Sequence, residues 1–512
     1  MDESKTGPRA VFWYAADLGG KASLTPVSRD SRDAVLGGLG ASLELVMPNM
    51  LGARPQGFSF RLTPRALGDL TPAALVAAIP FLAAAMECRG RAGEPGLAAE
   101  YPALDRLIAA LAPAAPKPAD ADIDRLFAML DLGEATPEAG GDGEALLARQ
   151  VGLLLDDPAL LRLEAAWRGI ALFLDGIEAD AEVEIRLISA PREVLAERVI
   201  EALEALDPED ASAPDAMLLA EVFDPRGPHA ATLGALAVAA EAASVPLIAE
   251  APADFLGLKL AEVATRHDPT AMMEGPAWNS WRGLRQKEPS RWLGLAWNRP
   301  WLRNAHELRH GLALPGFAGE NLPGPAVAVI GALLANAARQ GWPSALTAQT
   351  VAGPALAVIE AGGSREALAV EAAIGGETAK LLAGAGLLAL TGRPGRATIS
   401  LPVAQSVKAP GRIGGDTSLA RERASLPFML ASGRVTRAIT AMHADVAASP
   451  DPAEACAARL RALLAGTGPG AGVEVTTLPD PEEPGGRMLE VRLRFGAEVL
   501  GGAALAMDVP LG

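Results

Sequence analysis

The sharpest chemical pattern in the chain is the pentapeptide HELRH, which runs from His306 to His310. It matches H-E-x-x-H, in which two histidines one helical turn apart bind zinc and the glutamate, here Glu307, acts as a base. A zinc hydrolase of this type needs a third ligand from a downstream element. The following residues, GLALPGFAGENLPGP, are typical of a loop, and the only downstream histidine is His443. The ligand set is incomplete, so we predict no metal site and keep a zinc-dependent hydrolase using His306, Glu307 and His310 as the alternative.

A group of tryptophans is the second pattern that could serve a ligand. Five of the eight tryptophans lie between Trp278 and Trp301. Such a cluster could form a ligand platform or an interface, but large aromatic side chains more often build a core. The sequence contains neither a G-x-S-x-G elbow nor a glycine loop that continues into Lys-Ser/Thr. The sequence therefore gives no motif support for a serine hydrolase or a nucleotide-binding site.

The composition restricts the partners and the compartment. The chain has 512 residues and a formal net charge of −17 at pH 7, whereas nucleic acid and anionic lipid both attract clustered Lys and Arg. The two cysteines, Cys88 and Cys456, have no metal-binding spacing, which favours a reducing compartment. The polar N-terminus is unlike a signal peptide, and no apolar stretch is long enough for a membrane span. We expect a cytoplasmic protein that binds no nucleic acid and does not insert into a membrane.

Two breaks in composition indicate the domain organisation. The stretch APAAPKPADAD, Ala112 to Asp122, has three prolines among small residues and predicts a semi-rigid spacer. A second stretch, GEATPEAGGDGE, cannot pack a core. We therefore expect one domain over residues 1–112, a Pro/Ala/Gly-rich linker over 113–145 and a larger domain over 146–512.

Periodic patterns predict a mixed α/β (α+β) fold. In the first domain, AVFWYAADL is typical of a buried strand. In the second, MLLAEVF, HAATLGALAVAAEAA and VPLIAEA predict a β-α-β unit with parallel strands. Near the C-terminus, VEVTTL, MLEVRLRF and AALAMDV predict an antiparallel meander. The larger domain should therefore contain a mixed sheet and a C-terminal meander.

One predicted helix, which Asp157 and Pro158 begin, carries a bulky aromatic, a charge and a glycine in a row: Trp167, Arg168 and Gly169. Glycine inside a helix costs about 1 kcal/mol relative to alanine, so its presence needs a reason. Trp167 shares an apolar stripe with residues three or four positions away, Leu163, Ile170 and Leu174. We predict that Trp167 is core, that Arg168 pairs with a carboxylate or carbonyls, and that Gly169 admits a crossing element.

Several blocks of this second domain resemble the large subunit of the type VI secretion contractile sheath. The stretch ALLARQVGLLLDDPALLRLEAAWRGI is similar to the opening of that family's core. Its signature is present here as Leu163, Glu164, Trp167, Arg168 and Gly169. EGPAWNSWRGLRQKEPSRWLGLAWNRP resembles a second block, with Gly275, Pro276, Trp281 and Arg282 at the marked positions. AQSVKAP and SLPFMLASGRVTRAI follow in the family's order, so the resemblance extends from about residue 145 to the C-terminus.

The first domain resembles the small sheath subunit, in which a strand leads to an Asp-x-x-Pro helix start, here Asp69 and Pro72. The chain is therefore similar to a fusion of the two sheath subunits, with two sheath-type domains. Sheath subunits interlock through extended arms, and the first strand here begins at about Ala10. We expect the arm strands to be shortened or absent. The same resemblance places HELRH in a variable surface segment.

The resemblance implies a structural role, so we expect the chain not to be an enzyme, to have no catalytic residue and to need no cofactor. It implies a subunit that assembles in the cytoplasm around an inner tube and contracts to drive the tube outward. The implied partners are copies of the chain or other sheath subunits, the inner tube protein, the baseplate and a Clp-type AAA+ unfoldase. A non-polymerising, sheath-like adaptor is a further alternative beside the zinc hydrolase.

Overall fold

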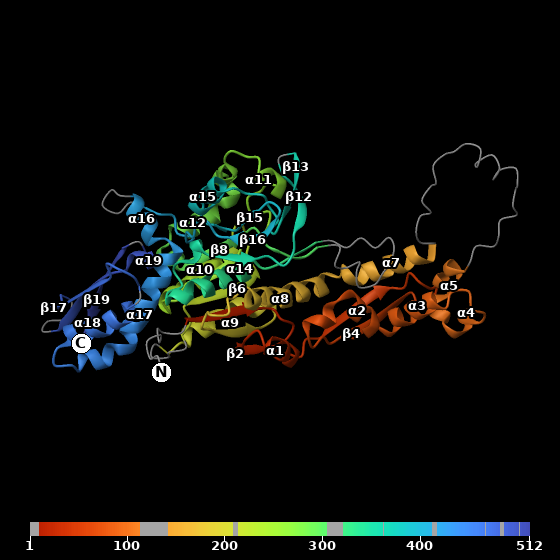
Figure 1. Ribbon diagram of the computed structural model, residues 1–512, viewed down its shortest axis with the longest axis horizontal. Coiled ribbons are helices and arrows are strands. Elements are labelled where there is room, and N and C mark those ends of the chain that lie inside the picture. The colour runs from red at the N-terminus through yellow and green to blue at the C-terminus, as the bar shows by residue number, and fades with distance from the viewer. Residues whose placement is uncertain are drawn as a thin grey trace. The chain divides into compact units, whose positions relative to one another are not determined.

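The computed structural model describes residues 10–112, 142–207, 213–304, 321–361, 363–411, 417–465, 467–481, 486–500 and 502–511. The chain forms two compact units, and Figure 1 labels their elements. The first, here called the sheet unit, consists of Met1–Val35, Ala165–Leu302 and Pro323–Gly512. The second, the hairpin unit, consists of Leu36–Glu164 and Arg303–Leu322.

A seven-stranded sheet with the order β14-β8-β7-β6-β1-β5-β2 is the centre of the sheet unit. Its strands are β1 (Ala10–Ala16), β2 (Ala22–Val27), β5 (Val183–Ser189), β6 (Ala216–Val222), β7 (Leu247–Glu250), β8 (Leu293–Trp297) and β14 (Leu388–Ala389). Neighbouring strands run parallel except β2, which pairs antiparallel with β5. The predicted mixed sheet and its β-α-β unit, β6-α10-β7, are thus confirmed.

The sequence of β1 explains its place in the middle of this sheet. All seven of its residues, AVFWYAA, are buried, which is typical of a parallel strand covered on both faces. Val11, Trp13 and Ala15 belong to the core cluster on one face. On the other face, Tyr14 contacts Phe173 of helix α8 (Pro158–Asp175), with ring centroids 5.8 Å apart.

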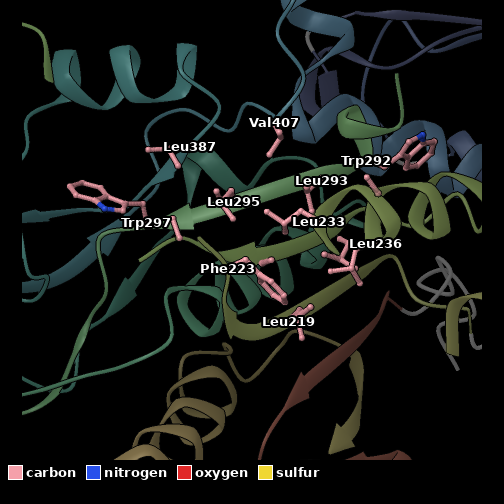
Figure 2. Packing of buried hydrophobic residues seen from close by; sticks show 14 of the residues in the cluster. Leu219, Phe223, Leu233, Leu236, Trp292, Leu293, Leu295, Trp297, Leu387 and Val407 are labelled. Atoms are coloured by element: carbon pink, nitrogen blue, oxygen red, sulfur yellow. The ribbon is translucent and has the colours of Figure 1, made fainter. Parts of the chain in front are cut away.

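Helices cover both faces of the sheet. Those of the sheet unit before residue 412 are α9 (Arg192–Glu204), α10 (His229–Ala242), α11 (Leu260–Val263), α12 (Asn279–Gln286), α14 (Ala326–Ala337) and α15 (Gly376–Gly384). Figure 2 shows side chains of α10, among them Leu233 and Leu236, beside Leu293 and Leu295 of β8 in one core cluster. On the opposite face, Gly331 of the fully buried helix α14 lies against Leu218 and Phe173.

The C-terminal part of the sheet unit is a second, smaller layer, drawn in blue in Figure 1. It consists of α17 (Leu426–Ala447), α18 (Pro452–Leu464), β17 (Gly472–Pro479), β18 (Arg487–Arg494) and β19 (Ala504–Pro510), and we call it the C-terminal layer. Its strands form an antiparallel sheet in the order β17-β18-β19. The predicted C-terminal meander is confirmed. One face of this sheet packs on α17 and α18 in a core cluster of its own.

Short elements complete the sheet unit. They are β9 (Trp301–Arg303) and β10 (Leu322–Pro323), which reach the unit boundary, the sheet β11 (Thr350–Ala352), β16 (Arg396–Ser400) and β15 (Thr391–Arg393), the pair β12 (Ala357–Ala361) and β13 (Ser364–Leu368), and the helices α16 (Thr417–Arg423) and α19 (Ala497–Leu500).

The hairpin unit combines one β-hairpin with helices. Its elements are β3 (Leu43–Pro48), β4 (Gly57–Leu62), α2 (Pro72–Ala78), α3 (Pro80–Gly90), α4 (Leu97–Glu100), α5 (Asp105–Leu111) and α7 (Asp142–Leu155), and α1 (Arg32–Gly38) and α8 begin or end across the boundary. Buried Gln150 of α7 accepts the N–H of Met50 at 2.8 Å and donates to the Pro48 carbonyl at 3.2 Å. This amide therefore fixes α7 to the end of the hairpin.

Proline separates the first two helices of this unit, because it cannot continue a helix in its interior. Helix α2 ends at Ala78 and α3 begins at Pro80, with a bend of 102° between them. Within the described ranges no single helix is long and apolar enough to cross a membrane, although this bent pair passes that test jointly. Thr71 precedes Pro72 at the start of α2, and its hydroxyl donates to the Gly68 carbonyl instead of capping the helix.

The division of the chain differs from the predicted boundary near residue 112. Strands β1 and β2 lie in the large sheet, whereas β3 and β4 form the hairpin unit together with α7 from beyond the linker. The reason is the unbroken apolar character of β1, which finds parallel neighbours on both sides only between β5 and β6. The predicted linker lies mostly outside the described residues, which stop at 112 and resume at 142.

Candidate functional site

Helix α8 carries the first signature of the sequence. Asp157 Oδ1 accepts the backbone N–H groups of Ala159 and Leu160 at 2.8 and 3.2 Å, and Pro158 is the first helical residue. The helix therefore begins as the sequence predicts. Trp167 is fully buried, and its Nε1 donates to the Leu18 carbonyl at 3.0 Å. Trp167 is core, as predicted, and its one polar atom is satisfied.

Gly169 is needed because another element comes too close for a side chain. A Cβ at this position would lie 2.4 Å from Cγ of Pro325 and 3.3 Å from the Tyr14 hydroxyl. Pro325 directly precedes α14, so the glycine lets the buried helix α14 begin against α8. The predicted close approach is confirmed. Arg168 is half-buried, and its pairing with a carboxylate or carbonyl stays a prediction.

Glu164, the acidic member of this signature, forms a buried ion pair in the hairpin unit. Arg303 donates to both of its carboxylate oxygens, with Nε–Oε1 at 2.8 Å and Nη2–Oε2 at 3.0 Å. The side chains of Glu164 and Arg303 are only 6% and 2% exposed. Because an uncompensated buried charge is costly, loss of either partner of such a pair typically destabilises a protein by about 3–5 kcal/mol. Sequence patterns alone do not indicate this partner of Glu164, which lies shortly before the HELRH pentapeptide in the chain.

The second signature forms a compact turn before α12. Gly275 and Pro276 start a short 3₁₀ helix, and Arg282 Nη1 donates to the Gly275 carbonyl at 3.0 Å. Trp281 is fully buried with its ring edge against Phe255, centroids 5.4 Å apart. The other tryptophans of the cluster up to Trp297 are also buried. The core interpretation of this cluster is therefore confirmed for four of its five members, while Trp301 is half-buried.

The two remaining blocks of the resemblance, AQSVKAP and SLPFMLASGRVTRAI, are joined to β8 and to each other by backbone hydrogen bonds. Val407 donates its N–H to the Leu293 carbonyl at 2.8 Å, and Arg285 Nε donates to the Val407 carbonyl at 3.0 Å. Leu426, at the start of α17, donates to the Ala404 carbonyl at 3.0 Å. Burial lowers the pKa of Arg285 to about 10, so it stays charged at neutral pH. Blocks far apart in sequence thus form one backbone-bonded cluster.

A buried carboxyl that the sequence analysis missed lies at the end of β7. Glu250 is 3% exposed, and its Oε1 accepts the N–H of Val327 in the first turn of α14 at 3.2 Å. That turn has no acidic residue of its own, so Glu250 supplies an acceptor for one of the free N–H groups at the helix N-terminus. Burial nevertheless raises the pKa of Glu250 to about 8, against the Val327 hydrogen bond and the charge of Arg299. Burial, and after it the charge of Glu250, raises the pKa of Tyr14.

The arrangement offers little for catalysis in the described part of the chain. No group of three His, Cys, Asp or Glu side chains there could hold a metal ion, and both cysteines are buried and free. His306, Glu307 and His310 lie outside the described residues, so the zinc alternative has no structural account. A cavity of about 820 Å³ lies between α9 and the strands β1, β2 and β5, and its described lining has no His or Cys. Of its charged side chains, Arg198 and Glu201 pair with each other.

The C-terminal sheet presents main-chain groups at both of its edges. Strand β17 has eight residues and β19 has seven, and within the described ranges each pairs only with β18. Leu478 of β17 is 37% exposed. Unpaired strand edges are templates for strands of other chains. Among the described elements, this is the longest open edge that could serve assembly.

Comparison with known proteins finds similarity over part of the chain. Residues 212–408 match the family model VipB, described as EvpB/VC_A0108, tail sheath N-terminal domain. The match includes β6, β7, β8 and β14 together with the Trp281 turn. The chain is also similar to the type VI secretion system sheath protein TssC1 of Pseudomonas aeruginosa, with 26% identity over 172 residues. That alignment covers 30% of this chain, and the chain spans about a third, 34%, of the length of that protein.

Proposed function

We propose that this chain, whose residues 212–408 match a tail sheath N-terminal domain, is a structural subunit of a contractile, phage-tail-like type VI secretion sheath. The observation that carries the proposal is the match itself, because it spans the four strands on one side of the central sheet and the turn that the second signature forms. The proposal assigns no catalytic residue, since the function lies in contacts between subunits.

The completion of the sheet supports the view that the chain fuses both sheath subunits. The three strands beyond the matched segment are β1, β5 and β2, and two of them come from residues 10–27. In a fused chain, these strands reach their neighbours β5 and β6 intramolecularly, at high effective concentration. Residues 10–112 thus act as the small-subunit part, although they divide between the two units.

The proposal includes partners and a place of action. The chain assembles in the cytoplasm with copies of itself or with other sheath subunits, around an inner tube and on a baseplate, and contraction drives the tube outward. A Clp-type AAA+ unfoldase then recycles the subunits. The exposed edges of β17 and β19 are the described surfaces best suited to add a strand from a neighbour.

Negative-stain electron microscopy of the full chain, alone and with its inner tube protein and any separate sheath subunits, tests the proposal. We expect ordered sheath-like assemblies in the presence of these partners. Particles that stay monomeric in every mixture would favour the adaptor, and one zinc per chain that is lost in His306→Ala would favour the hydrolase. Either result would contradict the proposal.

A matched pair of variants tests the assembly edge. Leu478→Lys places a charge on the open strand β17, where charged side chains oppose strand addition. Val238→Lys makes the same change at a residue of α10 that is 56% exposed. We expect Leu478→Lys to abolish assemblies and Val238→Lys to retain them, with both proteins melting like the wild type. Equal assembly of both variants would exclude the β17 edge.

A further inference from the structure

A buried carboxylate at the start of β6 receives two arginines from helix α17. Arg434 donates to both oxygens of Asp215, with Nε–Oδ1 at 2.8 Å and Nη2–Oδ2 at 2.7 Å. Arg437 Nη2 reaches Oδ1 at 3.3 Å. The carboxylate is 5% exposed, and the arginine side chains are 7% and 14% exposed. Asp215 also accepts the N–H of Val11 at 3.1 Å and donates its own N–H to the Val11 carbonyl at 2.7 Å.

Within the described ranges, two helix C-termini and no second acid balance the second guanidinium charge. Arg437 Nη1 donates to the carbonyl of Ser244, which follows Ala243, the C-cap of α10. Arg434 Nη1 donates to the carbonyl of Gly341, directly after the helical stretch that continues α14. Both acceptor residues have positive φ, 53° and 87°, which is typical of helix C-terminal caps. The negative ends of two helix dipoles therefore point at the arginines of α17.

Helix α17 packs closely against the residues that follow α10. A Cβ on Gly433 would lie 2.4 Å from the Ser244 carbonyl oxygen. The guanidinium of Arg434 lies 5.2 Å from the centroid of Trp342, a cation–π contact. Burial acts to raise the pKa of Asp215, but the charge and hydrogen bonds of Arg434 and the charge of Arg437 outweigh it and lower the pKa. Asp215 is therefore charged at neutral pH.

Helix α17 contributes to two core clusters, which also share the partly buried Leu500 and Leu505. Phe428 and Met429 in its first turn belong to the core of the large sheet. Ile439, Met442 and Val446 further along belong to the core of the C-terminal layer. Ala431 and Val435, on either side of Arg434, already belong to the second cluster, so the polar cluster lies where α17 passes from one core to the other.

We propose that Asp215, Arg434 and Arg437 form a lock that holds the C-terminal layer on the large sheet as one rigid body, and that the layer opens separately once the lock is broken. Asp215 is the only acid that the structure places on these two guanidiniums among the described residues. This consequence rests on the function proposed above: in a sheath subunit, the lock would transmit mechanical load between the large sheet and the open edges of β17 and β19.

Hydrogen exchange of the full chain with Asp215→Asn tests the lock. The amide keeps the size of the side chain, but it removes the charge and replaces one accepting oxygen by a donor, which leaves two buried guanidiniums uncompensated. We expect amides of β17, β18, β19 and the second half of α17 to exchange faster by on the order of a hundredfold. Amides of β8, at the far side of the sheet, should keep their wild-type rates.

A matched control is Glu371→Gln. Glu371 is also 5% exposed, and it pairs with Arg299 at 2.7 Å elsewhere in the sheet unit, so its loss should leave exchange in the C-terminal layer unchanged. Gly433→Ala provides a second way to open the lock, because its Cβ displaces α17 from Ser244, and it should give the same local pattern. Uniform acceleration across the sheet unit, or no acceleration in Asp215→Asn, would overturn the proposal. Because exchange is measured on unassembled protein, this outcome is independent of whether the chain builds sheaths.

Discussion

The large sheet and the C-terminal sheet of the sheet unit differ in how their faces are covered and in the length of their edge strands. The seven-stranded sheet is covered by helices on both faces, and it ends in the two-residue strand β14 and in β2, which carries a bulge and Pro26. The three-stranded C-terminal sheet is covered on one face and ends in strands of eight and seven residues. Short, bulged and proline-containing edges resist the addition of further strands. The edges of the first sheet therefore resist the addition of strands, whereas within the described residues the edges of the second leave main-chain groups unpaired.

The same contrast holds for polar groups. Each buried carboxyl of the large sheet and its surroundings has a defined partner, since Glu250 meets the N-terminus of α14, Asp215 the arginines of the lock and Glu371 the guanidinium of Arg299. In the C-terminal sheet, the side chains of β17 alternate between half-buried and exposed over its first five residues and are then exposed. Mutations should thus have large effects on folding in the first sheet and on association in the second.

The largest expected effect is that of Trp167→Ala in the covered face of the large sheet. The change removes a fully buried ring and the hydrogen bond from Nε1 to Leu18. Truncation of a buried tryptophan typically lowers the free energy of unfolding by about 3–5 kcal/mol. Urea denaturation of the variant and the wild type measures this difference. By contrast, Leu478→Ala on the open strand β17 should change the free energy of unfolding by less than about 1 kcal/mol. A Trp167→Ala protein that unfolds at the same urea concentration as the wild type would contradict the core assignment.

The second effect is a pH dependence that resides in the large sheet. Glu250 has a pKa near 8 when folded and 4.5 as its reference value, so the folded state binds the additional proton between these limits. Stability should therefore fall as the pH rises from about 4.5 to 8, by up to a few kcal/mol from this group. In Glu250→Gln, the part of this loss of stability that comes from Glu250 should be absent. Denaturation curves at pH 5 and pH 8, compared for the variant and the wild type, measure it. An identical pH dependence in both proteins would show that Glu250 is not the group responsible.

The third effect, of Gly169→Ala, is smaller. Alanine favours the helix by up to about 1 kcal/mol, but its Cβ would collide with Pro325 at 2.4 Å. Overpacking of this kind costs about 1–3 kcal/mol, so the variant should be net destabilised in thermal melts. Gly283→Ala on α12, where a Cβ meets nothing within 4 Å, is the control and should be neutral or stabilising. A stabilised Gly169→Ala protein would show that α14 can move away.

The smallest expected effect follows cleavage of the spacer. A protease site inserted between residues 113 and 141 should yield two fragments that stay together in gel filtration. The reason is that β1 keeps its register with β5 from Ala10 to Ala16 and pairs with β6 on its other side. Ala15→Pro, which removes a ladder donor from β1, should let the fragments separate. Fragments that separate without this substitution would show that the two parts of the chain do not form one sheet.

Much of the local structure was determined by the sequence. The apolar run of β1, the Asp157-Pro158 start of α8, the break at Pro80 and the C-terminal meander all follow from patterns that act over a few residues. The same holds for Trp167 and Gly169, because a helical stripe and an otherwise unfavourable glycine both indicate packing. The sequence pattern did not indicate that Pro325 is the residue that packs against Gly169.

The tertiary structure alone decided the pairings and the division into units. Nothing in the pattern of β1 says that its neighbours are β5 and β6, since parallel pairing depends on long crossovers and not on local sequence. Asp215, Glu250 and Arg303 show only as single charges beside apolar runs, and a charge in that position is solvated unless a distant partner covers it. Their partners Arg434, Val327 and Glu164 lie at least 77 residues away. Such pairs form because burial makes an uncompensated charge costly, and burial is a property of the complete fold.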